Sequence, residues 1–144
     1  KAVAAKDGIT ALSIKSERML LAHGFLRAVF EVFERHKTSI DMITTSEVAV
    51  SVTIDNAAHL KEIVKELEPF GSVEVESNLT IISVVGNEIA QTAEVLRKLF
   101  GSLSAIPVRM VSYGGSKHNV SLLVESTHKT QTLQLLNSGM FGLE

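Results

Sequence analysis

The sequence carries one pattern twice. Residues 9–14 (Ile-Thr-Ala-Leu-Ser-Ile) match residues 79–84 (Leu-Thr-Ile-Ile-Ser-Val), and residues 40–43 match residues 108–111, in the same order along the chain. Alternating apolar residues of a later segment also match, pairing Val48, Val50 and Val52 with Val120, Leu122 and Val124. The distance between matched segments drifts by only a few residues, so the insertions fall in loops. We therefore interpret the 144 residues as two copies of one unit.

The first copy, residues 9–77, predicts the element order β-α-β-β-α-β. Short runs rich in β-branched residues predict strands, and apolar residues at helical spacing predict helices. The expected strands are residues 9–14, 39–43, 48–54 and 73–75. The first helix is expected over residues 24–36. The second begins after Asp55 or Asn56, either of which would cap it.

The second copy, residues 78–144, repeats this order but runs out of chain before its fourth strand. Its strands are expected at 79–84, 108–112 and 120–124. One helix passes through Leu133 and Leu136, and the other is striped by Ile89, Ala93, Leu96 and Phe100. An unfilled strand position would leave a row of unpaired backbone groups. We expect the spare apolar run within residues 1–6 to fill it.

These elements predict an α+β fold of two units, each an antiparallel sheet with two helices on one face. The composition argues against several classes of partner. Lys and Arg number 14 against 16 Asp and Glu, a balance that argues against a nucleic acid partner. The chain has no Cys, and its five His lack ligand spacing, so we expect no metal. No apolar run reaches about 18 residues, so we expect no membrane partner and a cytoplasmic location.

No catalytic residues are expected. The run Gly114-Gly115-Ser116-Lys117 precedes a strand rather than a helix, which indicates a hairpin turn and not a phosphate-binding loop. Ser46 beside Glu47 has no His at an identifiable partner position. The first residue is Lys1 rather than Met, so we expect the chain to be part of a longer polypeptide.

The polar residues that remain lie near the first helix and the second strand of the first copy. A helix start offers free N–H groups to a carboxylate. Asp41 lies among Ile40, Met42 and Ile43, an unusual place to half-bury an acid. We expect the second strand to pair beside the first, so that the loop entering the helix faces Asp41. Amides and acids together suit a zwitterionic ligand. The alternative is a solvated edge Asp and an ordinary hairpin.

Two segments carry a resemblance to a known family. Gly24-Phe25-Leu26 with Val29-Phe30, followed by residues 39–48 (Ser-Ile-Asp-Met-Ile-Thr-Thr-Ser-Glu-Val), resembles the tandem ACT-domain regulatory region of aspartate kinases, most closely the lysine-sensitive, single-function type. The similarity covers essentially the whole chain, and residues 41–47 are its most specific part. It implies two ferredoxin-like βαββαβ (ACT) units. In this family a kinase domain, which nothing here resembles, precedes the ACT pair and phosphorylates aspartate with ATP and Mg.

The resemblance implies that the feedback inhibitor lysine binds in the first unit, at an interface between the first units of two subunits. Carried over by position, the contacts are Met19, Ala22, Gly24, Phe25, Ser39, Ile40, Asp41, Thr45, Ser46 and Glu47. Asp41 and Glu47 would hold ammonium groups, and Ser46 with the amides near Gly24 would hold the carboxylate. Relatives can carry a hydroxyl residue where this chain has Ala22, so a side-chain contact there is in doubt.

Three functions follow as hypotheses. The first is an amino-acid-sensing regulatory region, without a cofactor of its own, that forms a homodimer and is joined to a kinase domain. The second is a dimerisation module with a vestigial pocket, which the presence of Ala22 keeps open. The third is a small ferredoxin-like enzyme, disfavoured by the missing acid–base residues. Threonine and methionine remain alternative effectors.

Overall fold

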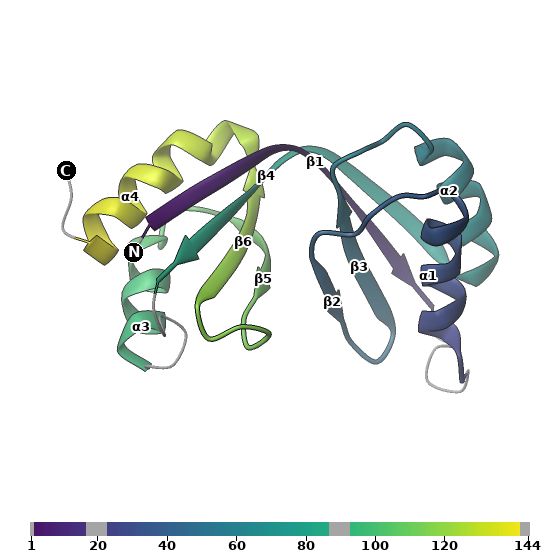
Figure 1. Cartoon of the computed structure of the whole chain (residues 1–144), viewed down its shortest axis with the longest axis horizontal. Coiled ribbons are helices and arrows are strands. Elements are labelled where there is room, and N and C mark those ends of the chain that lie inside the picture. Colours follow the sequence, from purple (N-terminus) through teal and green to yellow (C-terminus); the bar gives the residue numbers. More distant parts are fainter. Residues whose placement is uncertain (1, 17–22, 87–92, 142–144) are drawn as a thin grey trace. The chain divides into compact units, whose positions relative to one another are not determined.

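The computed structural model describes residues 2–16, 23–86 and 93–141. The described strands and helices follow the predicted order twice (Figure 1). In chain order they are β1 (Ala2–Lys15), α1 (Phe25–Arg35), β2 (Ile43–Thr45), β3 (Ala49–Ile54), α2 (Leu60–Leu67), the short 3-10 helix η2 (Glu68–Phe70), β4 (Ser72–Val85), α3 (Ala93–Ser102), β5 (Val108–Ser112), β6 (Asn119–Glu125), the short 3-10 helix η4 (Ser126–His128) and α4 (Lys129–Phe141).

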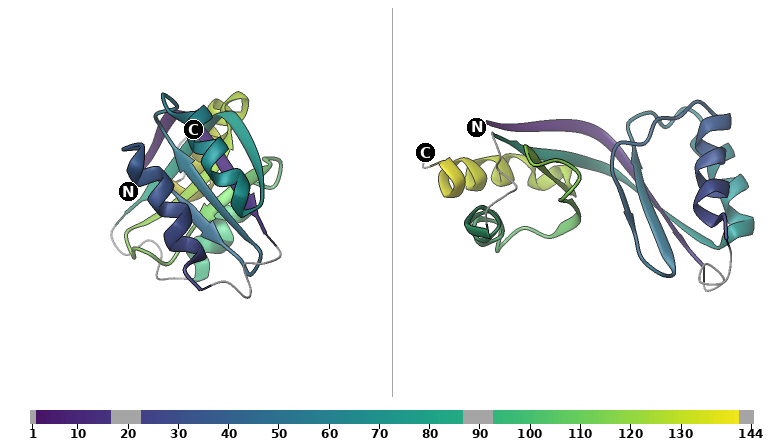
Figure 2. Two further views of the ribbon diagram at one scale, coloured as in Figure 1. Left: turned by 90° about the vertical axis from the view of Figure 1, so that its right-hand side faces the viewer. Right: turned by 60° about the horizontal axis from the view of Figure 1, so that its bottom comes forward.

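The chain divides into two compact units. The first unit is Gly8–Ser77, and the second unit is Lys1–Asp7 together with Asn78–Glu144. Strands β1 and β4 each contribute to both units (Figure 2). The runs 2–5 and 9–14, predicted as separate strands, are therefore one continuous strand, and so are 73–75 and 79–84. At the two unit boundaries Gly8 and Asn78 adopt left-handed backbone angles, with φ of 71° and 59°. Gly and Asn are the residues that tolerate this conformation best.

In the first unit the strand order is β2-β3-β1-β4. Strand β3 pairs antiparallel with β1, with Leu12 opposite Val52, and also with β2, with Thr44 opposite Ser51. The expectation that the second strand lies beside the first is therefore wrong. The helix α1 joins two parallel strands, β1 and β2, and the returning β3 fills the gap between them, so that every described pairing is antiparallel.

Helices α1 and α2 cover one face of this sheet and close the core of the first unit (Figure 1). Fully or almost fully buried are Leu12, Ile14, Val29, Val32, Phe33, Val50, Val52, Ile54, Ile63 and Leu67. The alternation predicted for β3 is confirmed at positions 50, 52 and 54.

The predicted cap of α2 is wrong. The cap position is His59, while Asn56 Oδ1 accepts a hydrogen bond from the Ala58 amide (3.0 Å) in the turn before the helix.

In the second unit the order is β1-β4-β6-β5, and the core lies under α3 and α4. Val3 of β1 packs against this core. Leu99 is the buried residue of α3, whereas Ala93 is exposed and Phe100 is 44% exposed, so the predicted stripe is wrong at both positions. Ile89 lies outside the described residues. The helix buries Leu99 and, beyond its end, Leu103, which are spaced by one turn.

The register also corrects the alignment of the two copies. Ser13 lies opposite Ser51 in the first unit and Ser83 opposite Ser121 in the second, and both hydroxyl pairs are hydrogen-bonded, at 2.7 and 3.0 Å. Val50 therefore corresponds to Val120, and the sequence match of Val48 with Val120 is two residues out of step. An alternating strand repeats every two residues, so this slip leaves the apolar pattern unchanged and cannot be seen in sequence.

Candidate ligand-binding site

The first functional segment is the start of α1. Gly24 adopts the left-handed conformation (φ 82°, ψ 8°), and its carbonyl accepts the first helical hydrogen bond from the Ala28 amide (2.9 Å). Phe25 is buried and packs edge-on against Phe70, with ring centroids 6.4 Å apart. The first turn contains no acidic residue. Its amides and the positive end of the helix dipole therefore favour a carboxylate at this end.

The second segment is the turn between β2 and β3. The Ser46 amide donates to the Ala49 carbonyl (2.9 Å), and the Ser16 amide at the end of β1 donates to the Val48 carbonyl (2.7 Å). Thr45, Ser46 and Glu47 are exposed. This turn and the start of α1 lie at the same end of the first unit (Figure 1), so a polar group and an acid lie at the end where a carboxylate would bind.

The third segment, residues 39–42, is not the strand that the sequence predicts. The Asp41 amide donates to the Thr53 carbonyl (2.8 Å), and the Thr53 amide donates to the Met42 carbonyl (3.0 Å). The Met42 amide is bound instead by Thr53 Oγ1 (2.8 Å). Two residues thus face one on β3, which is a β-bulge, and β2 begins only at Ile43. Asp41 is exposed rather than half-buried.

The bulge follows a tightly fixed end of α1. The Lys37 amide donates to the Glu34 carbonyl and the Thr38 amide to the Phe33 carbonyl, both at 2.9 Å. Lys37 is left-handed, with φ of 48°. These features form a Schellman motif with a non-glycine residue at the left-handed position. The buried Thr38 also donates its hydroxyl to the His36 carbonyl (3.0 Å).

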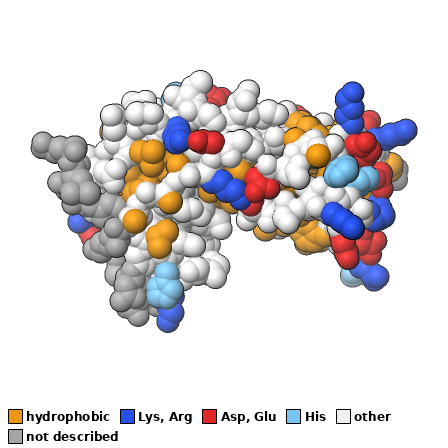
Figure 3. Space-filling view, turned by 45° about the horizontal axis from the view of Figure 1, so that its top comes forward, with side chains coloured by type: hydrophobic (Ala, Val, Ile, Leu, Met, Phe, Trp, Pro, Cys, Tyr) orange, Lys and Arg blue, Asp and Glu red, His pale blue; other side chains and the backbone are white. Residues whose placement is uncertain are grey.

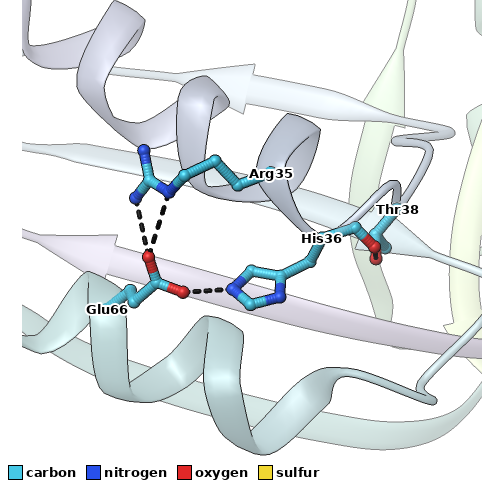
Figure 4. Close-up of polar contacts among 4 residues, drawn as sticks. All are labelled: Arg35, His36, Thr38 and Glu66. Carbon is cyan, nitrogen blue, oxygen red and sulfur yellow. Dashed lines mark hydrogen bonds and ion pairs between the residues drawn. The ribbon is translucent and has the colours of Figure 1, made fainter.

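An ionic cluster ties this helix end to α2 (Figure 4). Arg35 donates through Nε and Nη2 to Glu66 Oε1 (3.1 and 2.7 Å), and His36 Nε2 hydrogen-bonds Glu66 Oε2. The hydrogen bond from His36, and then that from Arg35, holds the pKa of the Glu66 carboxyl below its ordinary value. The chain therefore enters residues 39–42 from a fixed point.

The structure does not bring all the expected site residues together. Gly24 and Phe25 share one end of the unit with Thr45, Ser46 and Glu47, whereas Ser39, Ile40 and Asp41 precede the other end of β2. The seven residues from Asp41 to Glu47 would span at most about 20 Å if fully extended. Met19 and Ala22 lie outside the described residues. Sequence reasoning missed Thr53, a fully buried residue of β3 that alternates with the apolar core positions as Ser51 does.

The charges of the first unit are mixed in sign. Figure 3 shows Lys or Arg, Asp or Glu and His side chains grouped over its helices, so this face offers no continuous basic stripe. Among the described residues, no group of three or more His, Asp or Glu is placed to hold a metal ion. The helices in the same part of the chain are all too short or too polar to cross a membrane.

Comparison with known proteins identifies the class of protein to which this chain is similar. Residues 82–139 match the ACT domain family. A chain assigned as a C-terminal regulatory domain of aspartate kinase from Porphyromonas gingivalis W83 is 44% identical, over 97% of this chain and 96% of that one, with a TM-score of 0.88. The lysine-sensitive aspartokinase 3 of Escherichia coli K12 is 35% identical over 98% of this chain. The structure of E. coli aspartokinase III with lysine and aspartate is 34% identical, covers 97% of this chain and 33% of that one, and superposes with a TM-score of 0.86.

Two βαββαβ units of this kind define a tandem ACT-domain regulatory module, which confirms the predicted fold class. The chain belongs to the C-terminal regulatory regions of the aspartate kinase family, as the resemblance predicted. It spans about a third of the length of the curated relative from E. coli.

Proposed function

We propose that this chain is the part of an aspartate kinase that binds an end-product amino acid, lysine, and passes the signal to a kinase domain. Support comes from Asp41 and Glu47, two exposed acids in the two segments that flank β2. Lysine carries one ammonium more than threonine or methionine, so a site with two acids favours it. The E. coli relative, 34% identical, was solved with lysine bound.

The start of α1, Ser46 and Glu47 share one end of the first unit, and Asp41 precedes the other end of β2. The amides at the start of α1 and the Ser46 hydroxyl bind the carboxylate, while Asp41 and Glu47 bind ammonium groups. The two acids lie in separate segments, one before and one after β2, so we assign them to different chains at one lysine site. In the proposed arrangement, a two-fold axis between two first units brings Asp41 of one chain to Glu47 of its partner. We therefore propose a homodimer with two shared lysine sites.

The activity of the whole protein is part of the same proposal. A kinase domain preceding this module would use ATP and Mg to phosphorylate the side-chain carboxylate of aspartate, whereas the module itself needs no cofactor. Lysine at the first units would lower that activity as an allosteric feedback signal. We propose the cytoplasm as its location.

Isothermal titration of the chain with lysine, threonine and methionine tests the proposal. Saturable heat with lysine, at an affinity at least ten times that for the other two, is the expected result. Heat with none of the three would leave only the dimerisation role. If threonine or methionine binds more tightly, that amino acid is the effector. The second acid then has no ammonium group to bind.

A further inference from the structure

We propose that Thr53 is a positioning residue of the effector site, an inference that rests on the proposed function. Thr53 makes three hydrogen bonds to the segment that carries Asp41. Its carbonyl accepts from Asp41, its amide donates to Met42, and its hydroxyl accepts from the Met42 amide. The side chain of Thr53 is fully buried, so it contacts this segment rather than a ligand.

The hydroxyl of Thr53 accepts the hydrogen bond of the additional amide that the bulge brings to this point of β3. A bulge places two amides opposite a single backbone carbonyl, and here the Thr53 carbonyl accepts from Asp41 while the Thr53 hydroxyl accepts from Met42. The second amide belongs to Met42, a residue only 5% exposed, so water is a poor substitute partner. Without the hydroxyl, the Met42 amide shares the Thr53 carbonyl with the Asp41 amide, or the segment shifts to find another acceptor. Either outcome changes where the backbone presents Asp41.

The second unit supplies an internal comparison. It has a bulge at the matching place, because the register of β5 against β6 slips between Val108 and Met110 and leaves Arg109 as the extra residue. Arg109 corresponds to Asp41, and its guanidinium pairs with Glu125 (2.7 Å). Leu123, opposite Met110, stands where the first unit has Thr53. The duplicated bulge thus has a hydroxyl only in the copy whose extra residue is an acid.

Three variants of the chain test the proposal. Thr53→Val removes the hydroxyl and keeps the shape, and Thr53→Ser restores it. The control is Thr132→Val in the second unit, since Thr132 is also fully buried and donates its hydroxyl to a backbone carbonyl, that of His128 (2.7 Å). Lysine affinity is measured by isothermal titration, melting temperature by calorimetry, and exchange of the Met42 amide by NMR.

Thr53→Val should weaken lysine binding about tenfold and speed exchange of the Met42 amide, whereas Thr53→Ser keeps the wild-type affinity. Thr132→Val should lower the melting temperature without changing lysine affinity. If Thr53→Val does not fold, Thr53→Ala takes its place with the same expectation. Wild-type affinity in a folded Thr53→Val or Thr53→Ala chain, or equal weakening in Thr132→Val, would overturn the positioning role alone. A wild-type chain that binds no lysine would overturn the proposed function and this inference with it.

Discussion

At the scale of single residues, the two acids Asp41 and Glu47 carry the selectivity for a second ammonium group. A charge-assisted hydrogen bond contributes about 1.5–3 kcal/mol, or roughly ten- to a hundredfold in affinity. Asp41→Asn and Glu47→Gln should each weaken lysine binding by this factor while the chain stays folded. The rise in melting temperature that lysine causes in the wild type should shrink in both. Glu62→Gln, on the exposed surface of α2, is the control. Wild-type affinity in both site variants would place the site elsewhere.

Gly71 shows how closely the end of the first unit is packed. A Cβ at this position would lie 2.2 Å from the carbonyl oxygen and 2.9 Å from the carbonyl carbon of Lys15, which are backbone atoms and cannot rotate away. Gly71→Ala should therefore destabilise the chain by about 1–3 kcal/mol in urea unfolding. Gly101→Ala is the matched control, because its Cβ meets nothing within 4 Å. Equal stability of the two variants would contradict this account of Gly71.

The residues of the site differ in how far sequence could predict them. The helix start at Gly24 and Phe25 agrees with the sequence, because glycine is accepted at the N-cap before an apolar helical stripe. The exposure of Asp41 could not be predicted from the sequence. It depends on a β-bulge that is completed by the hydroxyl of Thr53, a residue of another strand. An apolar run such as Ile40-Asp41-Met42-Ile43 looks the same in a regular strand and in a bulged one.

At the scale of elements, the first part of β1 completes the second unit. Residues Lys1–Asp7 group with Asn78–Glu144, and Val3 packs on the core of that unit. Deleting residues 1–6 should expose the edge of β4 and promote aggregation. Hydrogen exchange should show lost protection in the part of β4 within the second unit. Loss confined to residues 8–77 would contradict this assignment of the strand.

Asp7 anchors the same segment through its charge. Its carboxylate accepts hydrogen bonds from Lys129 Nζ (2.7 Å) and Thr80 Oγ1 (3.0 Å), and these, Lys129 first, hold its pKa below the ordinary value. A carboxyl with a lowered pKa stabilises the fold above its unfolded-state pKa, and this contribution is lost as the pH falls through the folded-state pKa.

Asp7→Asn should therefore lower the melting temperature at neutral pH, and its difference from the wild type should shrink as the pH falls below the ordinary aspartate range. Lys129→Met, which removes the main donor, should reproduce part of the loss at neutral pH. A difference between Asp7→Asn and wild type that stays constant across the acid range would contradict the role of the charge.

The order of elements was predictable because each copy repeats the same apolar periods, 2 in strands and 3.6 in helices. Two features at this scale were not. The continuity of β1 and β4 depends on left-handed angles at Gly8 and Asn78, which usually mark turns. The neighbours of β2 depend on the topology of the sheet, because the sequence of an apolar strand does not indicate which strand it pairs with.

At the scale of the whole molecule, the exposed edge strand of the first unit and the placement of the two acids on either side of it predict the assembly. Strand β2 is the outermost strand of the first unit, and its Ile43 is 39% exposed, an unusual surface for a bare edge. We expect a symmetric homodimer formed largely through the first units, with two equivalent sites. Sedimentation should give a dimer with and without lysine. A monomer at high concentration in both conditions would contradict it.

Mixed dimers of two defective chains give the sharpest test of shared sites. In a dimer of one Asp41→Asn chain and one Glu47→Gln chain, one site combines both substitutions, while the other combines the intact Asp41 of one chain with the intact Glu47 of its partner. Subunit exchange should therefore restore lysine binding of wild-type affinity at half of the sites of each mixed dimer, measured by isothermal titration. Each variant mixed with itself is the control and should remain weak. If both acids served one site within a single chain, every site would keep one defect and mixing would restore nothing.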